Sequence, residues 1–256
     1  MVTTIDTYFH LRTTSHIYIF PSLILLMFDS YIIPILRLIC FYFLFLFTFL
    51  NLFHLQHSIE RCRLYSQKER EKRDLLDESY SYGEIDYEQF AKIFYKIELI
   101  YGINSRQSFL DLGCGVGTIV YTASIIGKFN LYVGIEYIQC LIDRADKRVT
   151  LWNKYTQERN SMEGSKIPQF RFLPNNFMIN TDWISDVSFI FLHWTAFSFP
   201  QINDICILLQ DCNEGTQCLT ITHPIPANQN TGFIIIDKGF IQATWGKAEY
   251  FLHEKI

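Results

Sequence analysis

Apolar residues are distributed very unevenly along the chain. Residues 17–53 hold little but aliphatic and aromatic side chains, whereas residues 60–77 are mostly charged. From residue 80 onward, short apolar runs typical of buried strands alternate with segments whose apolar residues recur at helical spacing. The pattern predicts three parts: an apolar N-terminal segment (1–59), a charged linker helix (60–79) and a folded domain (80–256).

Predicted strands and helices alternate within this domain. Such alternation predicts an α/β fold, a mostly parallel sheet with helices on both faces and right-handed crossovers. The last two strands have no full helix between them, so we expect an antiparallel hairpin that closes the sheet. The predicted helices span 85–101, 118–126, 140–157 and 202–210, and the predicted strands span 108–111, 131–136, 169–173, 187–192, 217–222, 232–236 and 250–253.

The N-terminal segment is a possible membrane anchor through residues 31–53. Its uncharged stretch, residues 38–53, must include Arg37 or His54 to reach the roughly 20 residues that a spanning helix needs. Cations follow the segment more densely than they precede it, which would place the domain in the cytosol. The alternative is that residues 1–59 are wrongly joined to the coding sequence, which leaves a protein of the cytoplasm or nucleus.

Composition limits the classes of function. The formal net charge is only -4, and the cations of residues 60–77 interleave with acidic residues, so no direct nucleic-acid binding is evident. Seven scattered cysteines indicate a reducing compartment. Cys206, Cys212 and Cys218 lie wider apart than the paired ligands of structural zinc sites, so no metal site is predicted.

The strongest chemical signal is a glycine-rich turn after the first predicted strand. Asp111 is followed by Gly113, Gly115 and Gly117, and the second strand ends at Glu136. Glycines allow a tight turn and close approach to a ligand, while the next helix offers free N–H groups to an anion. A strand-end acid can accept both hydroxyls of a ribose. This combination predicts S-adenosylmethionine, with Asp111 near its amino end, its carboxylate at the helix and its ribose on Glu136.

A nicotinamide or flavin dinucleotide is the rival cofactor. Its fingerprint is Gly-x-Gly-x-x-Gly, whereas Thr118 follows Gly117 here and the pattern is Gly-x-Gly-x-Gly. Because S-adenosylmethionine has no pyrophosphate to hold, a class I methyltransferase of Rossmann-like fold is favoured over a dehydrogenase. Asn176 and Phe177 follow the third strand, where they could contact the adenine; an ordinary polar turn is the alternative.

With these motifs in place, the chain resembles the non-SET histone lysine methyltransferases, the disruptor of telomeric silencing family, over about residues 80–253. The resemblance implies an S-adenosylmethionine site and a narrow channel that delivers a protein lysine, with a histone as the family's target. The matching segments are 82–84, 111–117 with Glu136, 176–177, and 244–247 with 250–253.

The resemblance also implies roles around the acceptor. Glu84 would bond the cofactor or the amine, and Tyr82 would pack over the methionine chain. An apolar, aromatic channel lowers the pKa of a lysine amine because it disfavours the charged form. Taken singly, each aromatic residue is more often part of a core than of a channel, and only the positions at strand ends favour the channel. The candidates for the lining are Trp194, Phe197, Trp245, Tyr250 and Phe251.

Two residues depart from the family pattern. Asn176 stands where the family has Asp, and His193 stands after the fourth strand where the family usually has Asn. A neutral His193 could accept a hydrogen bond in place of that Asn, or it could be a strand-end histidine bonded to backbone.

The leading hypothesis for the whole chain is a protein (histone-like) lysine N-methyltransferase. The alternatives are a non-histone protein or small-molecule substrate, and a catalytically silent binding module that keeps the fold.

Overall fold

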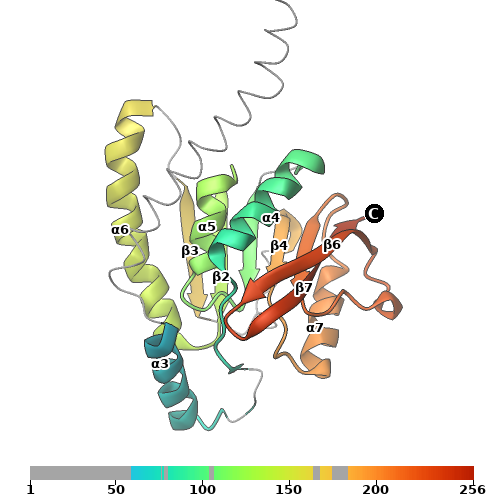
Figure 1. Ribbon diagram of the computed structural model, residues 1–256, viewed down its shortest axis with the longest axis horizontal. Helices are drawn as coiled ribbons and strands as arrows, with labels where there is room; N and C mark the ends of the chain where they lie inside the picture. Colours follow the sequence, from blue (N-terminus) through green and yellow to red (C-terminus); the bar gives the residue numbers. More distant parts are fainter. Residues whose placement is uncertain (1–58, 76, 78–79, 104–106, 164–167, 175–183) are drawn as a thin grey trace, which may run out of the picture. The chain divides into compact units, whose positions relative to one another are not determined.

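The chain forms a seven-stranded sheet in the computed structural model, which describes residues 59–75, 77, 80–103, 107–163, 168–174 and 184–256. The strand order is β3-β2-β1-β4-β5-β7-β6 (Figure 1). Strands β1 to β5 pair in parallel, and β7 runs antiparallel between β5 and β6. The order reverses between β1 and β4, and α/β sheets bind ligands beyond the carboxyl ends of the strands at such a point.

Helices and strands lie close to their predicted positions, and the predicted Rossmann-like fold with its C-terminal antiparallel hairpin is confirmed. The strands are β1 (Ser108–Leu112), β2 (Leu131–Glu136), β3 (Gln169–Pro174), β4 (Val187–Leu192), β5 (Gln217–Ile221), β6 (Phe233–Ala243) and β7 (Gly246–Lys255). The helices are α3 (Ile59–Lys72), α4 (Tyr87–Ile100), α5 (Thr118–Ile126), α6 (Gln139–Glu163) and α7 (Phe199–Leu209), with short 3-10 turns at Ile184–Asp186 and Ala227–Gln229.

The C-terminal hairpin is longer than predicted. Its strands were expected over residues 232–236 and 250–253, but β6 and β7 continue until only Thr244 and Trp245 connect them. Residues 237–243 mix polar and apolar side chains without a clear strand pattern, so the sequence does not predict a strand there. Their backbone pairs with residues 246–252 of β7, so the hydrogen bonds between the strands outweigh the weak local strand preference. The tight connection places Trp245 at the hairpin tip.

Helix α4 begins at a side-chain cap and packs through a helical stripe. The Asp86 side chain accepts a hydrogen bond from the Gln89 N–H at 2.9 Å, which satisfies one of the unpaired donors of the first turn. Phe90 and Phe94, four residues apart, lie on the same face of the helix and are fully buried. This face packs against the aromatic residues of the sheet.

Side-chain alternation along β1 and β4 separates two layers of core. Phe109 of β1 and Phe189 and Phe191 of β4 contact the rings of α4, with centroids 5.0 to 6.5 Å apart. The intervening residues point to the other face and pack with α7, as period-2 alternation requires. The cluster on that face includes Leu110, Leu112, Ile190, Leu192, Ile202 and Ile205.

Helix α3, predicted as a charged linker helix, contacts α6. Residues 56–256 form one compact unit, and Figure 1 shows α3 at the end of α6 where that helix begins. Cys62 and Ser66, four residues apart, are buried on the packed face. The expected ion pairing is present, with Arg73 2.9 Å from Glu69. Because only one narrow stripe of α3 is buried, the charges dominate its sequence and conceal the packing.

The predicted membrane-spanning segment, residues 31–53, lies outside the described residues. Within the part of the chain that the structure does describe, we find no helix long and apolar enough to cross a bilayer. The anchor stays a prediction.

His253 of β7 offers a test of core chemistry. Its Nε2 accepts the Ile225 N–H at 3.2 Å and its Nδ1 lies 3.2 Å from the Cys218 carbonyl, so the neutral ring with the proton on Nδ1 satisfies both contacts. Burial lowers the pKa of His253 to about 4, from about 6.5 in the unfolded chain. Between these values the unfolded state binds the extra proton, so stability falls as the pH drops through this window.

We predict that His253→Gln lowers the free energy of unfolding at pH 7 by about 1–2 kcal/mol, because one or both hydrogen bonds are lost. The variant should then lose less stability than the wild type between pH 7 and pH 4.5. Urea denaturation at the two pH values measures both effects. His223→Gln, at an exposed histidine, is the control and should keep the wild-type pH dependence. Equal pH dependence of His253→Gln and wild type would contradict the assignment.

Candidate functional site

Two adjoining cavities lie at the carboxyl ends of β1, β2 and β4. The larger measures about 310 Å³ and extends past Glu136, and the smaller measures about 30 Å³ and reaches Asp111. Together they are of the size of small-molecule sites. Four residues line both cavities: Tyr82, Gly83, Gly113 and His193. All but Gly83 are predicted site residues.

The glycine turn opens the N-terminus of α5 to the smaller cavity. The Gly113 and Cys114 N–H groups donate to the Ile135 carbonyl at 2.8 and 3.0 Å, which folds the turn back onto β2. Gly117 is the N-cap with φ +78°, and no side chain caps the helix there. The Thr118 hydroxyl is buried at the same end, with no hydrogen-bond partner among the described residues. The helix end therefore offers several donors to an anionic group.

Asp111 supplies the opposite chemistry a few residues away. Its side chain is 2% exposed at the end of β1 and lines the smaller cavity. Burial raises the pKa of Asp111 well above its usual range, and the negative charge of Glu136 raises it further. A ligand ammonium group would reverse this shift because it favours the carboxylate. Asp111 and the end of α5 thus match the two charges of an amino acid.

Glu136 connects the end of β2 to both neighbouring turns. One carboxylate oxygen accepts the Gly115 N–H at 3.0 Å, and the other accepts the Ile138 N–H at 2.9 Å. Burial raises the pKa of Glu136, and these backbone hydrogen bonds oppose that shift. Each oxygen keeps a second lone pair, so the carboxylate can also accept two hydroxyl groups, as a ribose diol requires.

The entry loop covers the glycine turn. The Tyr82 hydroxyl donates to the Glu84 carboxylate, and the ring lies against Gly115, where an added Cβ would come 2.6 Å from Tyr82 Cε2. Burial and the negative Glu84 hold the pKa of Tyr82 well above its usual range. The loop is held in turn by Thr244 at the hairpin tip, whose N–H donates to the Glu84 carbonyl at 3.0 Å.

His193 and Trp245 form a wall of the larger cavity beside the entry loop. Their rings are parallel within 2°, with centroids 4.6 Å apart. Burial lowers the pKa of His193 to about 4, and its Nε2 is buried without a hydrogen-bond partner among the described residues. A Cβ on Gly83 would come 2.8 Å from the Trp245 ring, so this wall and the entry loop meet through a glycine. His193 is therefore neutral at pH 7, and it lines both cavities while its Nε2 stays unpartnered within the described part of the chain.

The structure does not bring Tyr250 to these residues. Its hydroxyl donates to Asp237 Oδ2 at 3.1 Å and lies 3.4 Å from Lys96 Nζ, between β6 and α4. Tyr250 lies several residues down β7 from the hairpin tip, so pairing with β6 holds it away from the cavity.

The other aromatic candidates divide between cavity and core. Phe197 and Trp245 line the larger cavity. Trp194 is fully buried and donates its indole N–H to the His223 carbonyl at 2.8 Å, and Phe251 is buried in β7. Asn176 and Phe177, the predicted adenine contacts, lie outside the described residues.

Other lining residues were missed from the sequence. Tyr137 and Leu141 line the larger cavity directly after Glu136, and their position in the chain could have identified them. The Tyr80 ring, which also lines this cavity, lies tilted against the Tyr137 ring, with centroids 5.4 Å apart. Arg63 of α3 also lines this cavity, but it belongs to a charged run in which no residue stands out.

The chain is similar to proteins of a known family. The model of the family described as "Histone methylation protein DOT1" matches residues 75–241. The chain belongs to this family. It is also similar to the histone-lysine N-methyltransferase, H3 lysine-79 specific, of Kluyveromyces lactis, with 24% identity over 190 residues, covering 73% of this chain and 32% of that protein. The DOT1-family chain thus spans about a third of the length of this curated relative.

Among solved structures, the chain is similar to the magnesium protoporphyrin IX methyltransferase of Synechocystis PCC 6803 with bound SAM, at 13% identity and a TM-score of 0.48, over 76% of this chain and 95% of that one. It is also similar to a SAM-dependent methyltransferase of Leishmania major, at 10% identity and a TM-score of 0.46, over 77% and 82% of the two chains.

The contact between Tyr82 and Gly115 can be tested by substitution. We predict that Gly115→Ala lowers stability more than Gly102→Ala, its matched control. Both glycines have positive φ (+55° and +68°), but nothing lies within 4 Å of a Cβ on Gly102. Gly102→Ala should cost about 1 kcal/mol from backbone strain, and Gly115→Ala roughly 1–3 kcal/mol more from the clash with Tyr82. Thermal denaturation measures the difference, and equal losses would rule out the close packing.

Proposed function

We propose that this DOT1-family protein is an S-adenosylmethionine-dependent methyltransferase that methylates the side-chain amine of a protein lysine, with a histone as the substrate. The observation that carries the proposal is the pairing of the buried Asp111 with the uncapped end of α5, in one crevice with Glu136. This arrangement matches the amino acid and ribose parts of S-adenosylmethionine at the same time.

The residues of the crevice fit this cofactor part by part. Asp111 would hold its ammonium group, and the N–H groups of α5 with the unpartnered Thr118 hydroxyl would bind its carboxylate. Glu136 would accept the ribose hydroxyls. Asn176 and Phe177 remain the proposed contacts of the adenine. When bound, S-adenosylmethionine supplies a methyl group on a positively charged sulfur.

The protein's part in methyl transfer is to align a neutral amine and exclude water. His193 is suited to the alignment, because its buried, neutral ring can accept a hydrogen bond from the amine N–H. The face of Trp245 against His193 makes this wall apolar, which favours the uncharged amine. Glu84, held by Tyr82, also lines the smaller cavity and can accept from the cofactor or the amine.

The choice of a histone is supported by family membership and by the name of the Kluyveromyces lactis relative. A membrane anchor through residues 31–53 would favour a different protein substrate at the cytosolic face. Nucleosomes, free histones and total protein extract, each supplied with methyl-labelled cofactor, separate these possibilities. Label on a histone lysine supports the proposal, and label on other proteins only would redirect it.

Cofactor binding tests the site directly. We predict that the full chain binds S-adenosylmethionine and that Asp111→Asn and Glu136→Gln each weaken binding by roughly 10- to 100-fold, because each removes a charge-assisted hydrogen bond. Isothermal titration calorimetry measures the affinities. Glu249→Gln, at an exposed glutamate of β7, is the control and should bind like the wild type. Absence of binding to the folded wild type would refute the proposal.

The role of His193 is tested by kinetics. We expect His193→Ala to lower kcat about 10²-fold, since the amine loses its orienting acceptor, with little change in affinity for the cofactor. His223→Ala is the matched control. Unchanged kcat in His193→Ala would exclude the role. A higher kcat in His193→Asn than in the wild type would instead support a silent module whose site has decayed.

A further inference from the structure

Helix α6 begins without a cap of its own. The residue before it is Ile138, whose side chain cannot accept a hydrogen bond from the first turn. The opening N–H groups of a helix have no partner within the helix, so a helix without its own cap takes acceptors from elsewhere. This start lies directly after Glu136, the residue that would bind the ribose.

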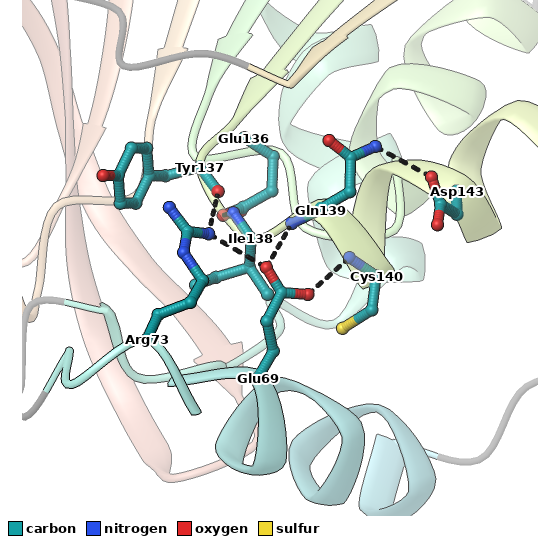
Figure 2. A network of polar contacts seen from close by, with 8 residues as sticks. All are labelled: Glu69, Arg73, Glu136, Tyr137, Ile138, Gln139, Cys140 and Asp143. Carbon is teal, nitrogen blue, oxygen red and sulfur yellow. Dashed lines mark hydrogen bonds and ion pairs between the residues drawn. The ribbon is translucent and has the colours of Figure 1, made fainter. Parts of the chain in front are cut away.

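Glu69 of α3 supplies those acceptors. One carboxylate oxygen accepts the Gln139 N–H at 2.9 Å and the other accepts the Cys140 N–H at 2.8 Å (Figure 2). Burial would raise the pKa of Glu69, but the hydrogen bonds from Cys140, Gln139 and Arg73 outweigh it and the pKa is lowered. The carboxylate is therefore negative beside the positive end of the α6 dipole, where a negative charge is stabilised.

Arg73 extends the contact to the turn itself. Its Nη1 lies 2.9 Å from Glu69 Oε1 and donates to the Tyr137 carbonyl at 3.0 Å, as Figure 2 shows. The guanidinium also lies over the Tyr137 ring, 4.4 Å from its centroid. Helix α3 and the residue that follows it thus hold the backbone at Tyr137, Gln139 and Cys140.

Glu136 depends on the same short turn. Its Oε1 accepts the Ile138 N–H, which lies between the backbone groups held by Arg73 and by Glu69. Fixing the turn therefore fixes the direction in which the Glu136 carboxylate faces the larger cavity. A free turn would let this carboxylate follow the backbone away from the cavity.

We infer that Glu69, supported by Arg73, is a positioning residue for the cofactor site and acts through Glu136. The inference rests on the proposed function, because it assigns Glu136 to the ribose. Helix α3 therefore contributes to cofactor binding, because Glu69 affects how well Glu136 binds the ribose.

The test is a double-mutant cycle in the full chain, with S-adenosylhomocysteine as the probe in calorimetry. Glu69→Ala should weaken binding about tenfold in the wild-type background, and should have no further effect in the Glu136→Gln background. A purely structural role would weaken binding equally in both backgrounds, and that result would overturn the inference. Glu71→Ala is the matched control, because Glu71 is exposed on the same helix and accepts a hydrogen bond from Gln67.

A second measurement does not depend on a ligand. Amide hydrogen exchange of residues 136–141 should be faster in Glu69→Ala than in the wild type, and unchanged in Glu71→Ala. Unchanged exchange in Glu69→Ala overturns the inference. Failure of the wild type to bind the probe overturns the proposed cofactor site and its positioning together, whereas wild-type binding that Glu69→Ala leaves intact overturns the positioning alone.

Discussion

The site depends on hydrogen bonds between the glycine turn after β1 and the end of β2, where both a backbone carbonyl and a side-chain carboxylate accept. The Ile135 carbonyl accepts from Gly113 and Cys114, and the Glu136 carboxylate accepts from Gly115. These bonds hold the start of α5 and the Glu136 side chain in one crevice. Because parallel strands end together at one edge of a sheet, the reversal of strand order beside β1 leaves room there for a ligand.

A second set of contacts builds the outer walls from segments far apart in the chain. Thr244 at the hairpin tip is the meeting point: its hydroxyl accepts from Arg63 of α3 at 3.0 Å, and its backbone pairs with Glu84 of the entry loop. Trp245, the next residue, is thereby placed against His193. The larger cavity therefore owes its shape to α3, the entry loop and the hairpin as much as to the sheet.

Charge is distributed so that each part of the crevice suits a different group. Asp111 and Glu136 are acids whose burial disfavours their charged forms, while the end of α5 offers donors without a carboxylate to cap it. His193 stays neutral because it is buried beside Trp245 with no acid as a partner in the described part of the chain. A ligand with an ammonium group, a carboxylate and a diol matches Asp111, the end of α5 and Glu136. A neutral amine matches the wall of His193 and Trp245.

The sequence by itself determined the α/β fold, the glycine turn, Asp111 and Glu136, because these depend on alternation along single strands and on local turn chemistry. Only the tertiary structure decided that Trp245 rather than Tyr250 reaches the cavity, and that Glu69 and Arg63 support it. Strand register and hairpin length determine which aromatic side chain lies at the cavity, and neither can be predicted from the local pattern of polar and apolar residues. The sequence of α3 predicts a solvated charged segment. A glutamate that caps another helix has the same sequence signal as an exposed one, so only the packing of the two helices distinguishes them.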